Sequence, residues 1–369
     1  MLELDGSAGG GQLLRTALAL SAVTGEPFEM AGIRGDRPEP GLKPQHLAAV
    51  EAVAAACDAE VTDADHGSET LTFEPGPVRP GTYEVDIETA GSVLLVFDAL
   101  LPLATTLDDG EELVVRATGG TDVKWAPTTD HYRRVRLPLA RRAGVAAHAA
   151  VSRRGFYPAG GGEAALTLRS GDPQPLDLRD PGPTERVTVH SVAATALADA
   201  DVAERGARAA RQALRDVTTC PVETAGDYVE SDSPGAVVTL VAHADAARAG
   251  FDALGERGKP MEDVAAAAVR DYEQFRRRGP DAGSGRPAVD VHTADQYTKN
   301  SRMPPRRLQN TRRRQQARQE NHARRQPTPR GSDLTPQSLR PTPPPRPPRP
   351  PPVPGPGVLV PRDVAPPGR

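Results

Sequence analysis

The sequence predicts an α+β fold, with a large domain of repeated units, a smaller inserted α/β domain and a disordered C-terminal tail. Strand-like and helix-like patterns alternate along most of the chain and are separated by glycine-rich junctions. One arrangement of strand, glycine loop, helix, strand, loop and helix occurs twice, starting at residues 2 and 83. A repeat of this length predicts layered units that share one core rather than a thin solenoid.

The first unit begins with a short strand at residues 2–4 and a glycine-rich loop. A helix follows over residues 12–24, because apolar residues recur at helical spacing before Gly25 ends it. Residues 28–34 are expected to form a strand. Pro44 then opens a second helix, with Leu47, Val50 and Ala54 on one face.

The second unit repeats this order. Its expected strands are residues 83–87 and 113–117, and its expected helices are residues 93–101 and 128–142. The sequence pattern then changes over residues 186–278, where expected strands at 187–192 and 237–241 alternate with expected helices at 202–217 and 264–275. We therefore divide the chain into repeats one and two (1–185), a small inserted α/β domain (186–278), the start of a third repeat (279–296) and a tail (297–369).

The third repeat breaks off. Residues 289–296 match residues 85–92 at four of eight positions, but no helical face follows residue 296. The last 73 residues hold 19 of the 39 prolines and no strand pattern, so we expect them to be disordered or polyproline-like. They are either a natural Pro/Arg tail that binds RNA or a partner, or the product of a frame shift near codon 297. We favour the frame shift, because the break falls inside a repeat.

The net charge of −4 is the sum of an acidic segment and a basic segment. Residues 297–369 carry 16 Lys and Arg against three acids, whereas residues 1–296 carry 29 against 46. The acidic body holds only three of the four lysines, which predicts a protein hydrated in high salt and a halophilic source. Any RNA site in this body must be a local cluster of arginines.

Other classes of protein are disfavoured. Cys57 and Cys220 have no cysteine cluster around them, which argues against a disulfide framework or a cysteine-based zinc site. No signal peptide is predicted at the N-terminus, and the most apolar run, residues 93–107, is too short to span a membrane. We expect a cytoplasmic protein.

Two loops in the first unit carry candidate site residues. Residues 5–12 include four glycines before a helix with Arg15 one turn in, which suits either a phosphate cradle or a plain tight turn. Residues 33–47 form a Pro/Gly-rich loop whose polar side chains suit phosphate binding. His46 alone would more often be a helix cap, but the density of these side chains favours a site; they are Arg34, Arg37, Lys43, Gln45 and His46.

Further loops are less specific. Residues 119–122 and 153–162 are glycine-rich turns, and the second adds arginines and two aromatic residues that could contact phosphate and stack on bases. Packing in the core or at an edge is the favoured role for Phe156 and Tyr157. The segment His292-Thr293-Ala294-Asp295-Gln296 could hold a nucleotide or cap a helix. The sequence has no Walker A motif, no Rossmann fingerprint and no usual His/Glu metal spacing.

As an ordered series over residues 1–296, these motifs resemble the RNA 3′-terminal phosphate cyclase family. The resemblance rests on DGS…GGGQLLRT at 5–16, RP…PGL…QHL at 37–47, AGS at 90–92, GGTD at 119–122, GFYPAGGG at 155–162, VAER at 202–205, LGERGKP at 254–260 and ADQ at 294–296. It implies repeated β-α-β-α-β-β units, with a smaller α/β domain inserted in them. It also implies ATP-dependent conversion of an RNA 3′-phosphate to a 2′,3′-cyclic phosphodiester, with a divalent metal, Mg²⁺ or Mn²⁺. The ligands would be ATP and RNA with a 3′-phosphate end.

The resemblance assigns roles to matching positions. Arg37, Gln45 and His46 would contact the RNA end or its phosphate. The ATP contacts would come from a larger set, namely Arg15, Asp98, His292, Thr293, Ala294, Asp295 and Gln296. In this family a histidine attacks ATP and is adenylated, AMP passes to the RNA 3′-phosphate, and the 2′-hydroxyl displaces AMP to close the ring.

The chain departs from the family pattern in three places. The loop at residues 5–12 is two residues shorter and lacks a glutamate, and Asp98 stands where the family has a glutamine. The histidine strand expected after residue 296, of the type Thr/Ser-x-His-x-x-Thr-Asn, has no match, and His322 does not fit it. We therefore expect no catalytic histidine and little or no activity. The alternative is a non-catalytic relative that binds RNA or assists ribosome assembly.

Overall fold

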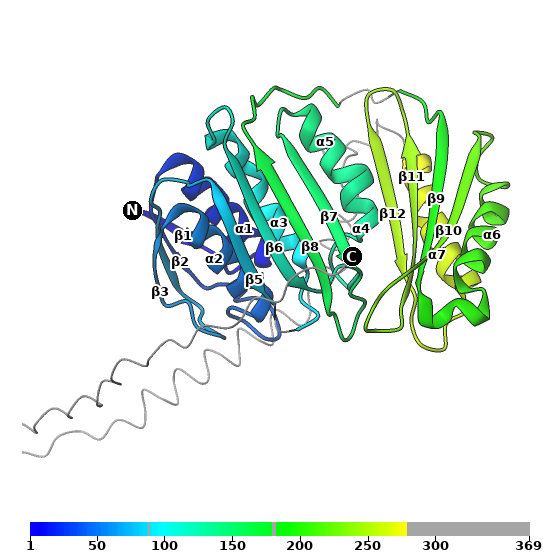
Figure 1. Cartoon of the computed structure of the whole chain (residues 1–369), viewed down its shortest axis with the longest axis horizontal. Helices are drawn as coiled ribbons and strands as arrows, with labels where there is room; N and C mark the ends of the chain where they lie inside the picture. The colour runs from blue at the N-terminus through cyan, green and yellow to red at the C-terminus, as the bar shows by residue number, and fades with distance from the viewer. Residues whose placement is uncertain (88, 179–181, 279–369) are drawn as a thin grey trace, which may run out of the picture. The chain divides into compact units, whose positions relative to one another are not determined.

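The computed structural model describes residues 1–87, 89–178 and 182–278 (Figure 1). The expected start of the third repeat, the segment from His292 to Gln296 and the Pro/Arg tail all lie outside these residues. No helix in the described part of the chain is long and apolar enough to cross a membrane.

The first repeat forms one four-stranded sheet covered by two helices. Its elements are β1 (Leu2–Asp5), α1 (Gly11–Thr24), β2 (Phe28–Ala31), α2 (Pro44–Cys57), β3 (Glu60–Thr62) and β4 (Leu71–Glu74). The strand order is β1-β2-β4-β3, with β1 and β2 parallel and the other pairs antiparallel.

The second repeat has the same topology. Its strands follow the order β5-β6-β8-β7, again with one parallel pair, β5 with β6. The strands are β5 (Gly81–Asp86), β6 (Glu112–Gly119), β7 (Ala147–Arg153) and β8 (Gly162–Arg169). The helices are α3 (Val93–Leu100), the 3₁₀ segment η1 (Leu101–Thr106), α4 (Thr129–His131), the π-helical η2 (Tyr132–Arg136) and α5 (Leu137–Arg142). The repeated β-α-β-α-β-β unit is thus confirmed.

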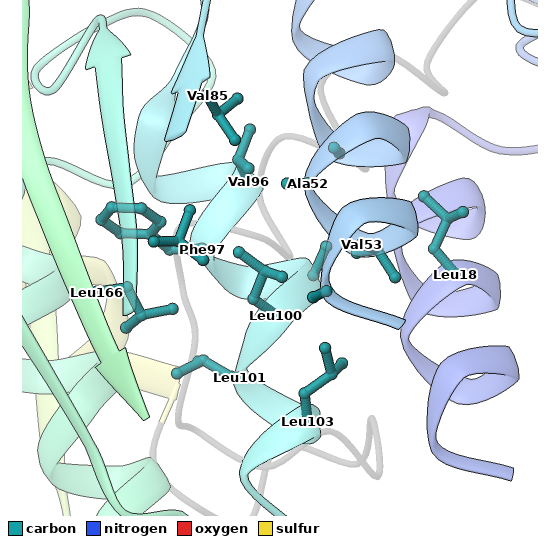
Figure 2. Close-up of a cluster of buried hydrophobic side chains, with 14 of the residues drawn as sticks. Leu18, Ala52, Val53, Val85, Val96, Phe97, Leu100, Leu101, Leu103 and Leu166 are labelled. Carbon is teal, nitrogen blue, oxygen red and sulfur yellow. The ribbon is translucent and has the colours of Figure 1, made fainter. Parts of the chain in front are cut away.

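The two repeats share one hydrophobic core. Helix α2 packs against α1, α3 and β5, so it is enclosed by neighbours from both repeats. Figure 2 shows Val53 of α2 between Leu18 of α1 and Leu100 of α3, with Val96 one turn before Leu100 on α3. All four are fully or almost fully buried. Burial of this kind, at roughly 25 cal/mol per Å² of apolar surface, is the main favourable term holding the repeats together.

A third sheet lies in residues 186–278. Its strands are β9 (Arg186–Ala194), β10 (Val222–Val229), β11 (Ala236–His243) and β12 (Arg248–Leu254), in the order β10-β9-β11-β12. Helices α6 (Val202–Leu214) and α7 (Met261–Arg278) pack together against one face of this sheet. The expected strands and helices of this region are present, but its boundaries as a separate domain stay a prediction.

Two local expectations were wrong. The strand expected at 28–34 ends at Ala31, because Gly32 and Arg34 adopt left-handed φ angles of 64° and 57° and turn the chain. The apolar face of α2 is also wider than the expected Leu47–Val50–Ala54 stripe. Ala49 and Val53 are fully buried, whereas Leu47 and Ala54 are only half-buried, since helices pack on both sides of α2.

Candidate functional site

The glycine loop before α1 is in contact with the loop before α2. A Cβ atom built on Gly10 would lie 3.2 Å from Nη2 of Arg37, and one on Gly11 would overlap the imidazole of His46. Gly10 is the N-cap of α1 and has no capping side chain. The amides of a helix N-terminus lack intrahelical partners and carry partial positive charge. A guanidinium, an imidazole and this helix end together form a place where an anion is favoured.

His46 is oriented by the backbone. The amide of Lys43 donates a 3.0 Å hydrogen bond to Nδ1 of His46. In the neutral imidazole the proton then resides on Nε2, the atom nearest to Gly11. Burial lowers the pKa of His46 to about 3, helped by the charges of Arg34, Arg15 and Lys43. His46 therefore caps α2 and presents a neutral Nε2–H group within a cluster of cations.

The other cations of this loop have defined partners. Arg34 donates from Nη1 to the carbonyl oxygens of Glu39 at 2.9 Å and Gly41 at 2.7 Å, which holds the loop in shape. Lys43 forms an ion pair with Glu39 at 2.9 Å. Arg37 is half-buried and has no carboxylate partner among the described residues. Its guanidinium is therefore the cation of this loop best placed to take a phosphate.

Gln45 connects this loop to the second repeat. Its Oε1 accepts a 3.4 Å hydrogen bond from the amide of Ser92, the N-cap of α3. A Cβ built on Gly91 would lie 3.0 Å from the Cβ of Gln45. The N-termini of α1, α2 and α3 are thereby linked through three loops. Arg37 and His46 face the start of α1 and Gln45 faces the start of α3, and their shared role in binding an RNA end stays a prediction.

The remaining glycine motifs meet at the same junction. The amide of Gly120 donates to the carbonyl of Gly91 at 2.8 Å, and the amide of Thr121 donates to Gly155 at 2.9 Å. A Cβ on Gly160 would lie 3.0 Å from the Cα of Ala90. Loops that are separate turns in the sequence are thus joined by backbone hydrogen bonds and close packing at Ala90 and Gly91, beside Gln45.

Arg154 is a structural residue rather than a phosphate ligand. It is buried and donates to both carboxylate oxygens of Asp122, at 2.9 and 3.0 Å, and to Asp130 at 2.5 Å. Burial would lower the pKa of Arg154, but the two carboxylates raise it above its ordinary value. Sequence reasoning missed this cluster, because its members are 24 and 32 residues from Arg154 and form no local motif.

The adjacent aromatic residues have different environments. Phe156 is 1% exposed and packs with Val192 and Val237 of the third sheet, as expected for a core residue. Tyr157 is 45% exposed, and Nζ of Lys124 lies 5.1 Å from its ring centroid. Trp125, one residue further, is 68% exposed. Exposed aromatic rings beside a cation are suited to stacking on nucleobases.

Of the residues expected to contact ATP, only Arg15 and Asp98 lie in the described part of the chain. Arg15 lies in α1, and its charge contributes to the lowered pKa of His46. Asp98 forms a 3.1 Å ion pair with Arg136. The segment from His292 to Gln296 lies outside the described residues, so the nucleotide contacts assigned to it stay predictions. Among residues 1–278, with their gaps, no three His, Cys, Asp or Glu side chains form a group that could hold a metal.

Comparison with known proteins places this chain in a family. The family described as RNA 3′-terminal phosphate cyclase matches residues 7–321. The chain belongs to this family. Its match extends beyond residue 296, where the series of recognisable motifs ends. Cyclases of this family are enzymes of the ligase class that act on RNA and use ATP.

Named cyclases from several microorganisms are similar to this chain. The RNA 3′-terminal phosphate cyclase of Halobacterium salinarum is 46% identical over 308 residues, covering 80% of this chain and 86% of that protein. The cyclase of Pyrococcus furiosus is 40% identical over 276 residues, covering 73% and 79%. The cyclase of Nitrosospira multiformis is 39% identical over 305 residues, covering 80% and 82%.

Proposed function

We propose that the loops at the start of α1 bind the phosphorylated 3′ end of an RNA next to ATP, for conversion of the RNA 3′-phosphate to a 2′,3′-cyclic phosphodiester. The observation that carries this proposal is the position of Arg37 and His46 against Gly10 and Gly11. A terminal phosphate carries more negative charge than an internal phosphodiester. A guanidinium fork, a neutral N–H donor and a helix N-terminus are therefore suited to select it.

The reaction requires an activated phosphate, because a 2′-hydroxyl cannot displace oxide from a phosphate monoester. In the proposed sequence a histidine attacks the α-phosphate of ATP and pyrophosphate leaves. The RNA 3′-phosphate then takes the AMP from the histidine, and the 2′-hydroxyl attacks that phosphate, loses its proton and expels AMP. Arg37 and His46 would hold the phosphate and offset its charge during these steps. The described residues do not form a magnesium or manganese site by themselves, so the divalent metal stays a prediction.

We further propose that this polypeptide has little or no cyclase activity, because no histidine after residue 296 stands in a matching segment. Incubation with ATP labelled in its α-phosphate should yield no covalent protein–AMP adduct. A stable adduct that maps to a histidine would contradict the proposal. The origin of the tail can be checked in the gene, where the neighbouring reading frame after codon 296 should encode an apolar helix and a His-x-x-Thr-Asn strand.

Binding can be tested without turnover. The chain should bind a short RNA ending in a 3′-phosphate more tightly than the same RNA ending in a 3′-hydroxyl. Arg37→Gln should remove most of that preference, whereas Arg133→Gln, an exposed arginine on η2, should retain it. Equal affinity of the wild type for both RNAs would overturn the proposed function.

A second candidate is a non-catalytic RNA-binding or ribosome-assembly protein. The observation that favours it is the basic tail of 16 Lys and Arg against three acids, together with the missing histidine segment. Under this reading the preference for a 3′-phosphate would be absent, and the chain would co-sediment with ribosomal particles.

A further inference from the structure

A row of basic side chains crosses the third sheet. In the strand register, His243 of β11 lies opposite Arg186 of β9 on one side and opposite Arg248 of β12 on the other. Directly opposite residues of antiparallel strands point to the same face of a sheet. The three side chains therefore form a single row, with Nη2 of Arg186 lying 3.4 Å from Nδ1 of His243.

Two further arginines approach this row from the helical segment of the second repeat. Nη1 of Arg248 donates a 3.1 Å hydrogen bond to the carbonyl of Arg134 on η2. The charge of Arg141, on α5, is close enough to lower the pKa of Arg248. Figure 1 shows α5 beside the end of the sheet where β12 begins. We call Arg186, His243 and Arg248, with Arg134 and Arg141, the basic row.

The charges of the basic row are poorly neutralised. Arg134 is paired with Asp130 at 2.9 Å. Within the described part of the chain neither Arg186 nor Arg248 has a carboxylate at ion-pair distance, although Glu185 and Asp245 are near in sequence. Burial lowers the pKa of Arg248, and so do the charges of Arg186 and Arg141. Burial also lowers the pKa of His243 to about 4, with Arg186 and Arg248 adding to the effect.

Such an arrangement destabilises the free protein, because Arg186 and Arg248 carry like charges on the two sides of His243 and repel each other. It is also unexpected in a body of residues 1–296 with 46 acids and 29 Lys and Arg. Arg186, Arg134, Arg141 and Arg248 are all exposed, so an anion can reach them from solvent.

The basic row is separate from the site at α1. Gly235, just before β11, would place a Cβ against Phe156 at the glycine-loop junction. His243 is at the opposite end of β11, seven residues after Ala236. At the usual rise of a strand, the distance along β11 from Ala236 to His243 is roughly 23 Å. A ligand that reached both places would have to be an extended chain.

We propose that the basic row binds the phosphodiester backbone of the RNA upstream of its 3′ end. This inference rests on the proposed function, because it assumes that the bound chain is the RNA whose end lies at α1. Arginines arranged in an exposed row suit a succession of phosphates, each contact releasing counterions. A protein groove for single-stranded RNA commonly spans about 4–16 nucleotides, which is long enough for this separation.

The test compares RNAs of two lengths. Binding of labelled single-stranded RNA is measured by fluorescence anisotropy, at the lowest salt at which circular dichroism shows the chain folded. The probes are a 16-nucleotide RNA with a 3′-phosphate, the same RNA with a 3′-hydroxyl, and a trinucleotide with a 3′-phosphate. For the double variant Arg186→Gln/Arg248→Gln we expect about a 10- to 100-fold loss of affinity for both 16-mers and no change for the trinucleotide. The slope of log K against log salt should decrease by about 1.4 for two lost phosphate contacts.

Arg211→Gln is the matched control, because Arg211 is an exposed arginine on α6, which covers the other face of the sheet. Its affinities should equal those of the wild type. The double variant should also unfold at the same or a higher urea concentration than the wild type, since repulsion is removed, so misfolding would be recognised.

Equal affinity of wild type and double variant for the 16-mers would overturn the inference, as would a wild type that binds neither 16-mer. Arg37→Gln separates the two proposals. It should remove most of the preference for a 3′-phosphate and leave the effect of the basic row intact. A wild type without that preference whose 16-mer binding still depends on Arg186 and Arg248 would refute the proposed end recognition and keep the backbone contact.

Discussion

The imidazole of His46 occupies the space that a side chain at Gly11 would need. His46 is buried and held by the amide of Lys43, so it has little freedom to move away. The first residue of α1 is thereby restricted to glycine, and the helix end comes close to the loop that carries Arg37.

Gly11→Ala should therefore destabilise the protein by about 1–3 kcal/mol, the usual range for overpacking. Alanine would otherwise favour the helix by up to about 1 kcal/mol, so a net loss reports the clash. Gly10→Ala is the matched variant, since its Cβ would meet only the mobile end of Arg37, at 3.2 Å. Urea unfolding at constant salt measures both. Similar midpoints for the two variants would show that His46 can move aside.

The lowered pKa of His46 makes stability depend on pH. Its ordinary value is 6.5 and its folded value is about 3. Below pH 6.5 the unfolded chain binds a proton that the folded chain does not, so stability falls as pH decreases toward 3. The slope from this group is at most about 1.4 kcal/mol per pH unit. His46→Asn keeps an acceptor for the Lys43 amide but cannot take up the proton. The unfolding free energy of His46→Asn should decline less steeply than that of the wild type between pH 6.5 and pH 3. Equal slopes for the two proteins would contradict the lowered pKa of His46.

Arg154→Met should lower the free energy of unfolding by about 3–5 kcal/mol, because it leaves the Asp122 carboxylate buried without its cation and leaves Asp130 with only Arg134. Arg169→Met is the control. Arg169 pairs with Glu112 at 2.7 Å, but both side chains are exposed, so its loss should cost no more than about 1 kcal/mol. Chemical denaturation of both variants checks this, and equal losses would refute a structural role for Arg154.

Phe156 and Tyr157 should respond oppositely to truncation. Phe156→Ala should destabilise the fold by about 3–5 kcal/mol, because the ring is buried against the third sheet. Tyr157→Ala should change stability little but weaken RNA binding by about 1–3 kcal/mol if a base stacks on the ring. Tyr157→Phe keeps the ring and should retain affinity. If Tyr157→Ala binds RNA as tightly as the wild type, Tyr157 does not stack on a base and only packs at the edge of the fold.

Many of the helices and strands could be predicted because each depends on a local pattern of apolar residues and glycines. The helix over α1 and its end at Gly25 follow from apolar spacing and from a residue that takes a left-handed φ of 74° without strain. The sequence did not predict strands β3, β4, β7, β8, β10 and β12, of which β10 and β12 are the two edges of the third sheet. Edge strands need fewer apolar residues, and β10 has no fully buried residue, so no alternation marks it.

The candidate site could be predicted only as separate loops. Arg37, Gln45 and His46 are polar residues in one stretch, and a glycine run precedes a helix, so each loop is recognisable by itself. That His46 faces Gly11 and that Gln45 accepts a hydrogen bond from Ser92, 47 residues away, depends on how the helices pack. No local pattern encodes these contacts.

The sequence by itself determined the family and the repeated unit, since both depend on the order of residue types along the chain. Only the tertiary structure decided that Arg154 is enclosed by Asp122 and Asp130, that Phe156 is buried while Tyr157 is exposed, and that Arg186, His243 and Arg248 share one row. The physical reason is that burial and charge pairing depend on distances through space. Strand register and helix packing set those distances between residues far apart in the chain.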